Sequence, residues 1–232
     1  MIPKLIHQTA KTSAVDPKWA PFRKTLLEFH PGWTYRLWTD EDNLALLGDR
    51  RPDLMEVYRN MTQPAMRADL MRYIYMQQFG GLYLDLDYQF LKPFDLSDKS
   101  VVLPRESDDD QPVYLGNCLL ASEAGHPFWT ALLDAIEASP PTKDTVRTEQ
   151  DSVDQAGPGM VTRVWREGFQ DDSTIFVPPR FWFNPLIPRT DADTEALRAR
   201  GESYGIHWCF GSWRDLTLWS KVKRRIRRAL SL

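Results

Sequence analysis

The sequence of 232 residues predicts an α/β domain in which helices are layered on a sheet. Three observations support this fold class: strand-like and helix-like segments alternate, no segment repeats, and 42% of the residues are hydrophobic, including nine Trp. This composition supports a substantial core, and the length suits one large domain. We expect a single domain over residues 1–218 and a basic tail over residues 219–232.

The first part of the chain alternates short strands with helices. Apolar and β-prone residues predict strands at 4–8 and 34–38. Helical spacing of apolar residues predicts a helix over 17–29. A helix over 40–47, capped by its first residue, and another over 52–58 are expected to follow.

The segment "TQPAMRADLMRYIYMQQFGG", residues 62–81, predicts the most important helix of the chain. Pro64 suits a first helical turn, and Gly80 or Gly81 suits the residue that ends a helix. Apolar residues surround nearly the whole circumference of this helix. We therefore expect it to be buried.

The segment "GGLYLDLDYQF", residues 80–90, predicts a buried strand that carries two carboxylates. Alternation along a strand places Tyr83, Asp85 and Asp87 on one face. Two like charges roughly 6.5–7 Å apart in a dry environment require a cation or a shifted pKa. Oxygen ligands without thiolates suit Mg²⁺ or Mn²⁺, which also bind the phosphate oxygens of a ligand.

Two further charged residues, Asp69 and Arg72, share one face of the buried helix. Taken alone, they predict a structural salt bridge, because buried charges need partners. Their position just before Asp85 and Asp87 predicts instead that all four groups meet at the carboxyl edge of the sheet. Open α/β sheets bind their ligands at that edge.

The second part of the chain continues the alternation. It predicts, in order, a strand within 99–106, a helix over 126–139, a polar loop over 140–157, a helix over 157–168, and strand-like pieces within 174–183 and 203–213. A loop of that length is often a lid or an acceptor-binding element. His207, in the last piece, is a candidate third metal ligand that would favour Mn²⁺, although a lone His is more often structural.

The charges divide the chain into an acidic body and a basic tail. The net charge is −3, and six Lys or Arg lie between residues 221 and 228. A helical tail would carry an apolar stripe among these cations and could anchor on an anionic membrane surface. A solvated terminal helix that packs on the domain is the equal alternative. We expect no nucleic-acid partner, because the acidic body would repel one.

The remaining sequence features concern the cellular compartment in which the protein is expected. The first residues contain no apolar run of signal-peptide length, and no stretch approaches the roughly 18–20 apolar residues of a membrane span. We expect a cytoplasmic protein, either free or peripheral on the inner face of the cytoplasmic membrane. Cys118 and Cys209 show no C-x-x-C spacing, so both are predicted to be buried free thiols.

Four segments together resemble a known enzyme family: "IPKLIHQT", "YRLWTD", "RADLMRYIYMQQFGGLYLDLD" and "HWCFGSW". They are similar to the D-x-D glycosyltransferases that include Golgi initiating α-mannosyltransferases, lipid-inositol mannosyltransferases and the glucosyltransferase domain of large clostridial toxins. The resemblance spans residues 2–213. A D-x-D alone is a weak signal, but an Asp and an Arg before it, a Gly-Gly and a late Ser-Trp form a specific combination.

The resemblance implies a GT-A (Rossmann-like) fold, with a mixed central sheet flanked by helices. It also implies metal-dependent, retaining transfer of a hexose from a nucleotide diphosphate sugar, a UDP- or GDP-sugar, to a glycan or lipid-linked acceptor. Mn²⁺, or alternatively Mg²⁺, would be the cofactor. We expect attack from the face that the diphosphate leaves, without a committed covalent nucleophile.

The resemblance assigns roles to the charged residues. Asp87 would bind the metal, with His207 at the metal and diphosphate. Asp85 would contact the ribose or sugar of the donor and reach the metal through water. Asp69 and Arg72 would hold the hydroxyls of the transferred sugar, so their role would be positioning.

Other residues would complete the donor site. The donor-binding set adds to Asp69, Arg72 and Asp85 the residues Gln8, Thr9, Tyr83, Ser212 and Trp213, of which the last two would close over the donor. Family members often have a base-stacking Trp after "IHQT", where this chain has Ala10. Either Trp38 or Trp213 would then stack on the base, or the donor would differ from the usual ones.

Two other functions compete with this interpretation. One is a nucleotide-sugar-binding module at the membrane surface with weak or lost turnover, which Ala10 supports. The other is a D-x-D phosphatase, in which the first Asp accepts a phosphate. Gln89 stands where such phosphatases usually have Thr or Val, which disfavours that alternative.

Overall fold

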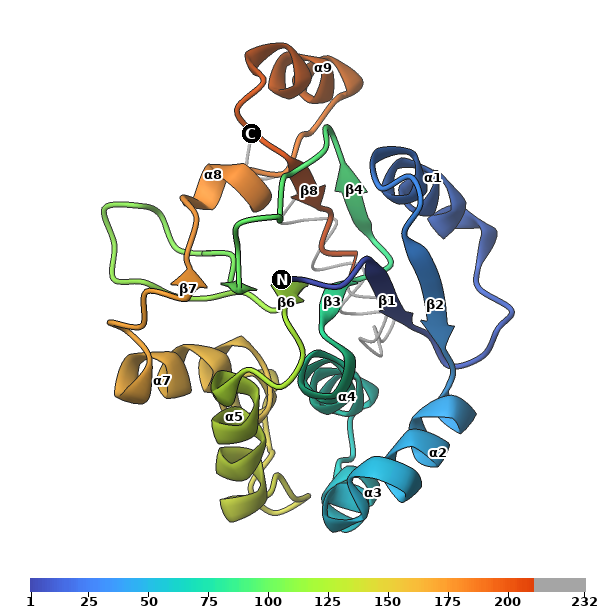
Figure 1. Ribbon diagram of the computed structural model, residues 1–232, viewed down its shortest axis with the longest axis vertical. Coiled ribbons are helices and arrows are strands. Elements are labelled where there is room, and N and C mark those ends of the chain that lie inside the picture. Colours follow the sequence, from blue (N-terminus) through green and yellow to red (C-terminus); the bar gives the residue numbers. More distant parts are fainter. Residues whose placement is uncertain (211–232) are drawn as a thin grey trace.

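The computed structural model describes residues 1–210, which form a mixed six-stranded sheet with helices on both faces (Figure 1). Its strand order is β2-β1-β3-β6-β5-β7. Strand β1 is parallel to β2 and β3, β6 is antiparallel to β3 and β5, and β7 is parallel to β5. The strands are β1 (Leu5–Thr9), β2 (Thr34–Trp38), β3 (Gly81–Leu84), β5 (Val101–Val102), β6 (Leu119–Ser122) and β7 (Ile175–Phe176). The predicted α/β class is confirmed.

A second sheet and the helices surround this central sheet. Strands β4 (Tyr88–Phe90) and β8 (Gly205–His207) form an antiparallel pair. Figure 1 shows α1, α8, α9 and this pair on one side of the central sheet, and the other α-helices on the opposite side. The helices are α1 (Ala20–Phe29), α2 (Asp40–Arg50), α3 (Met55–Asn60), α4 (Pro64–Phe79), α5 (Pro127–Ala138), α6 (Glu149–Gln155), α7 (Pro158–Gly168), α8 (Arg180–Phe183) and α9 (Asp191–Arg200).

The inner strands β3 and β6 of the central sheet are buried on both faces because their side chains alternate between two cores. Tyr83 belongs to the core formed with α4, α5 and α7. Its neighbours Leu82 and Leu84 belong to the core that contains Leu26 of α1. Strands covered on both faces need apolar residues at every position, as the sequence of β3 shows.

Helix α4 is buried, as predicted, and a Gly-Gly turn leads from it into β3. All residues from 69 to 76 are buried. Gly80 has φ +62° and Gly81 has φ +94°. A Cβ on Gly81 would lie 2.3 Å from the carbonyl oxygen of Leu5, so only glycine fits where β3 begins beside β1.

The predicted continuous strand over 80–90 is wrong. Strand β3 ends at Leu84, and the amide of Tyr88 donates to the carbonyl of Asp85 at 3.1 Å, which forms a turn. Strand β4 then pairs with β8 rather than with the central sheet. Asp85 and Asp87 therefore lie in a turn at the carboxyl end of β3, and we call residues 85–87 the DXD turn.

Several smaller predictions are also corrected. Thr39, not Asp40, caps α2, because its hydroxyl accepts from the amide of Asp42. The polar segment 140–157 contains helix α6, which begins with a similar capping box at Thr148. The segment 174–183 forms only the two-residue strand β7 and then turns into α8. Strand β6 and helix α9 were not expected from the sequence.

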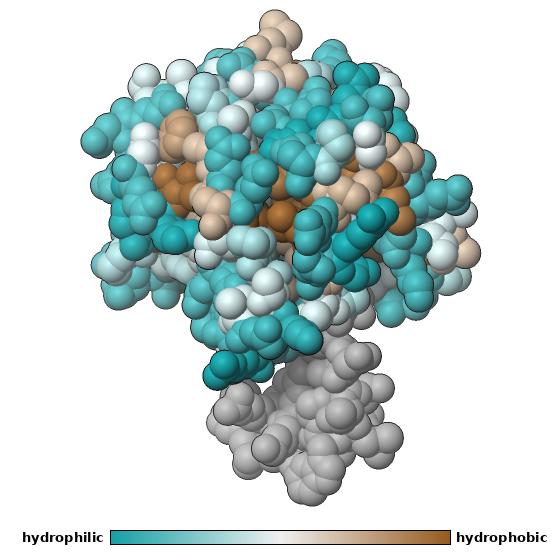
Figure 2. Space-filling view, turned by 90° about the horizontal axis from the view of Figure 1, so that it is seen from below, coloured by the Kyte–Doolittle hydropathy of each residue, from teal (hydrophilic) through white to brown (hydrophobic). Residues whose placement is uncertain are grey.

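Most side chains on the face seen in Figure 2 are hydrophilic. Figure 2 shows one face on which hydrophilic side chains surround a smaller hydrophobic area. Cys209 is exposed, so its predicted burial is wrong, whereas Cys118 is buried as predicted. Within residues 1–210, no helix combines the length and hydrophobicity needed to cross a membrane.

Candidate active site

Arg72 lies at the centre of the candidate site and joins three parts of the chain. Its Nη2 is 3.1 Å from Oδ1 of Asp69 and 3.3 Å from Oδ1 of Asp85. Its Nη1 donates to the carbonyl of Asn117 at 2.6 Å. The guanidinium also lies 4.6 Å from the ring centroid of Tyr83. Helix α4, the DXD turn and the segment that leads into β6 are thus held together by one buried cation.

Asp69 is held by a second residue, Asn117, which the sequence analysis missed. The Asn117 amide donates to Oδ1 of Asp69 and to the hydroxyl of Tyr73, both at 2.9 Å. The Tyr73 hydroxyl donates in turn to the carbonyl of Ala156. Burial raises the pKa of Asp69 to about 6, although Arg72 acts in the opposite direction. The Asp69 carboxylate is therefore fixed in orientation and titrates close to neutral pH.

Burial also acts on Arg72. It would lower the pKa of the guanidinium, but Asp85, Tyr83 and Asp69 outweigh burial and raise that pKa. Arg72 therefore stays charged, and it balances two carboxylates that would otherwise repel each other.

The two carboxylates of the DXD turn each leave one oxygen facing His207. Oδ1 of Asp85 accepts from the Tyr83 hydroxyl at 2.8 Å and forms an ion pair with Arg72, whereas its Oδ2 lies 3.8 Å from Nε2 of His207. Oδ2 of Asp87 accepts from the amide of Phe210, whereas its Oδ1 lies 3.4 Å from the same Nε2. These three donor atoms, two oxygens and one nitrogen, converge on one place.

Pairing of β4 with β8 brings His207 to the DXD turn. Tyr88, directly after the turn, is the register partner of His207. Burial raises the pKa of Asp87, but hydrogen bonds from His207 and from the Phe210 amide more than offset it, so the net pKa is below its usual value. An ionised Asp87 beside an imidazole and a second carboxylate fits a divalent cation of intermediate hardness.

Gln8 and Thr9 lie at the end of β1, and the side chain of each donates a hydrogen bond to a nearby backbone carbonyl. The amide of Gln8 donates to the carbonyl of Asp85 at 3.2 Å and its oxygen accepts from Tyr35. The Thr9 hydroxyl donates to the carbonyl of Trp38 at 3.1 Å and accepts from Asn43. Gln8 thus positions the DXD turn, and donor contacts by either residue stay a prediction.

The structure excludes Trp38 as a base-stacking residue. Its side chain is only 1% exposed. Its ring contacts the Arg36 guanidinium at 3.4 Å and stacks on Tyr75 at 4.7 Å, and its indole N–H donates to His7. A nucleotide base cannot reach a ring enclosed in this way, so this expectation is wrong.

Three other predicted features lie outside the described residues. They are Ser212, Trp213 and the basic tail over 219–232. Closure over the donor, base stacking by Trp213 and membrane binding by the tail therefore stay predictions.

Comparisons with known proteins agree with this fold and with the DXD turn. The chain resembles the solved structure titled PaToxG Glycosyltransferase with a TM-score of 0.57 and 17% sequence identity, and the match covers 96% of this chain and 83% of that one. This likeness and the mixed sheet with a DXD turn after β3 identify a GT-A fold. Residues 16–106 match the family described as glycosyltransferase sugar-binding region containing DXD motif. Within these residues the chain is similar to that family of DXD glycosyltransferases.

Curated relatives agree with this family. Mannosyl phosphorylinositol ceramide synthase CSH1 of Saccharomyces cerevisiae is 29% identical over 167 residues, which are 72% of this chain and 43% of the yeast protein. Initiation-specific alpha-1,6-mannosyltransferase of Schizosaccharomyces pombe is 25% identical over 92% of this chain and 64% of its own length. The chain thus spans less than two thirds of these relatives. The predicted resemblance to this family and the predicted GT-A fold are confirmed.

Proposed function

We propose that this glycosyltransferase is metal-dependent and retaining, and that it transfers a hexose from a UDP- or GDP-sugar to a glycan or lipid-linked acceptor. One observation carries the proposal: Oδ2 of Asp85, Oδ1 of Asp87 and Nε2 of His207 converge beside the buried Asp69–Arg72 pair. A cation site next to fixed polar groups is what a nucleotide diphosphate sugar requires.

The donor set supports Mn²⁺, with Mg²⁺ as the alternative. Asp85, Asp87 and His207 each offer one ligand atom, and these atoms lie within 4.8 Å of one another. An imidazole ligand favours Mn²⁺ over Mg²⁺. A bound divalent cation would neutralise the charge that the leaving diphosphate acquires.

Asp69 and Arg72 are proposed to position the transferred sugar. Both are buried and fixed by neighbours, so they can accept and donate hydrogen bonds to sugar hydroxyls with little loss of side-chain entropy. Asp69 is held by Arg72 and Asn117, and Asp87 faces the cation position. Neither carboxylate is therefore free to attack the sugar, which supports transfer without a covalent intermediate.

The names of the curated relatives suggest the sugar to test first. Those described above are named as a mannosyl phosphorylinositol ceramide synthase and an alpha-1,6-mannosyltransferase. We therefore propose mannose as the first candidate sugar, and an inositol-containing lipid or a glycan as the acceptor. The basic tail would bring the enzyme to a lipid acceptor on an anionic membrane from the cytoplasmic side.

A panel of nucleotide sugars incubated with the protein and Mn²⁺ tests this proposal. We expect one donor to release its nucleotide diphosphate, and ¹H NMR to show that the first free sugar formed keeps the anomeric configuration of the donor. Release with inverted configuration, or a glycosyl–Asp adduct in mass spectrometry, would contradict the retaining mechanism. A donor that raises the melting temperature without any release would favour the binding module.

A further inference from the structure

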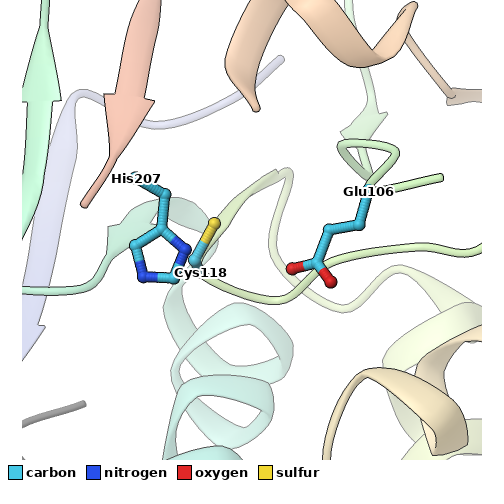
Figure 3. A group of neighbouring side chains, drawn as sticks. All are labelled: Glu106, Cys118 and His207. Carbon is cyan, nitrogen blue, oxygen red and sulfur yellow. The ribbon is translucent and has the colours of Figure 1, made fainter. Parts of the chain in front are cut away.

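A second group of metal-ligating side chains shares His207 with the candidate active site. We propose that Glu106, Cys118 and His207 bind a thiophilic divalent cation such as Zn²⁺, and that this ion inhibits the enzyme by taking His207 from the DXD site. Glu106 follows β5, Cys118 directly precedes β6, and His207 ends β8. Figure 3 shows the carboxylate of Glu106 directed toward Cys118 and His207.

The spacing of the donor atoms supports a metal site. One ligand atom from each of the three side chains lies within 4.8 Å of the other two. Zinc bonds of about 2.0–2.3 Å in tetrahedral geometry need donor atoms roughly 3.3–3.8 Å apart. A small inward movement of the side chains would therefore complete the site, and a water molecule or chloride would occupy the fourth position.

Glu106 is free to make that movement. Among residues 1–210, no side chain or amide donates a hydrogen bond to its carboxylate, although the side chain is partly buried. A partly buried carboxylate without donors is unusual, because such groups normally have partners. Gly116 leaves the space for it, since a Cβ there would lie 2.6 Å from Oε1 of Glu106.

Cys118 decides which cation binds. Its side chain is 2% exposed, and its thiol contacts Oδ1 of Asn184 at 3.5 Å. Zn²⁺ binds sulfur strongly and would replace the thiol proton, which leaves to the solvent, whereas Mg²⁺ and Mn²⁺ prefer oxygen. Hard cations are thus directed to Asp85 and Asp87, and soft cations to Glu106 and Cys118. His207 is the ligand that both positions share.

The first test uses Co²⁺ as a spectroscopic substitute for Zn²⁺ and needs no catalysis. A thiolate bound to Co²⁺ gives a charge-transfer band in the near ultraviolet. We expect this band in the wild type and its loss in Cys118→Ser, with at least tenfold weaker Co²⁺ binding in Glu106→Gln. Cys209→Ser is the matched control, because Cys209 Sγ also lies close to His207, 3.3 Å from Nδ1, but is exposed.

Thermal unfolding of each metal-free variant shows that it is folded before titration. No band in the wild type, or a band that is lost in Cys209→Ser and kept in Cys118→Ser, would overturn the proposal. Because this readout involves binding alone, it fails or succeeds independently of the proposed function.

The second test concerns inhibition and rests on the proposed function. Zn²⁺ is titrated into the Mn²⁺-supported release of nucleotide diphosphate. We expect wild type and Cys209→Ser to be inhibited at the same Zn²⁺ concentration, and Cys118→Ser to need at least ten times more. Equal sensitivity of all three proteins to Zn²⁺ would contradict the inhibitory role. The Co²⁺ spectra alone would then decide whether Glu106, Cys118 and His207 bind a metal.

Discussion

His7 joins β1, β2 and the Gly-Gly turn through a ring that must stay neutral. Its Nδ1 accepts from the indole N–H of Trp38 at 2.9 Å, so Nε2 carries the proton and donates to the carbonyl of Gly80 at 2.9 Å. Burial is the largest cause that lowers the pKa of His7, to about 4, with a smaller contribution from Arg36. Protonation of Nδ1 would break the bond from Trp38 and place a charge in the core.

The lowering of the pKa of His7 determines how much stability the protein loses at low pH. The folded-state pKa is below the unfolded value of 6.5, so the stabilisation is complete above pH 6.5 and is lost as the pH falls toward 4. At roughly 1.4 kcal/mol for each pKa unit, the full loss is about 3 kcal/mol. Between pH 7.5 and pH 5.0 we expect about 2 kcal/mol of this loss from the free energy of unfolding.

Urea unfolding of the wild type and of His7→Gln at both pH values measures this loss. A Gln side chain can accept from Trp38 and donate to Gly80, but it does not titrate. We expect the wild type to lose about 2 kcal/mol more than His7→Gln between pH 7.5 and pH 5.0. Equal losses in the two proteins would refute the assignment of a buried neutral His7.

Three further predictions concern the site and the turn before it. Because the pKa of Asp69 is about 6, the KM for the donor should rise as the pH falls from 7 to 5, and Asp69→Asn should remove this dependence; a flat wild-type profile would contradict its role. Arg72→Met leaves Asp69 and Asp85 without a cation and should lower the free energy of unfolding by about 3–5 kcal/mol in urea titrations. A loss of less than about 1 kcal/mol would show that the ion pairs of Arg72 contribute little to stability. Gly81→Ala should cost about 2–3 kcal/mol in the same assay, whereas Gly168→Ala, whose Cβ would meet nothing within 4 Å, should change stability by less than about 1 kcal/mol.

Local sequence patterns predicted helix α4 and the charged pair that it carries, because residues close together in the sequence determine both. Helix α4 was predictable because its apolar residues surround it and glycines follow it. The charged pair at Asp69 and Arg72 was predictable as a pair, because residues three apart share a helix face. The family resemblance adds the prediction that the pair positions the transferred sugar, which stays a prediction.

The convergence of Asp85 and Asp87 was predicted for a reason that the structure corrects. Alternating apolar residues over 80–90 suit a strand, and nothing local distinguishes a strand from a strand that ends in a turn. The turn exists because β4 leaves the central sheet and pairs with β8, more than a hundred residues later in the chain. Asp85 and Asp87 do meet, but at His207 rather than on one face of a strand.

The role of Asn117 was also not predictable from the sequence. Its partners Asp69 and Tyr73 lie 48 and 44 residues away on α4, so no local spacing connects them. A polar residue shortly before the buried strand β6 was the only available signal. Glu106 was missed for the same reason, because only the folded chain places it near Cys118 and His207.

The dependence of donor turnover on Asp87 and metal tests the central claim most directly. The rate of nucleotide diphosphate release from the active donor is measured for wild type, Asp87→Asn and the exposed control Asp98→Asn, each with Mn²⁺ and with EDTA. We predict that release occurs only with Mn²⁺, that Asp98→Asn matches wild type, and that Asp87→Asn loses at least a hundredfold. Unchanged release by Asp87→Asn, or release that persists in EDTA, would contradict a catalytic cation at Asp85, Asp87 and His207.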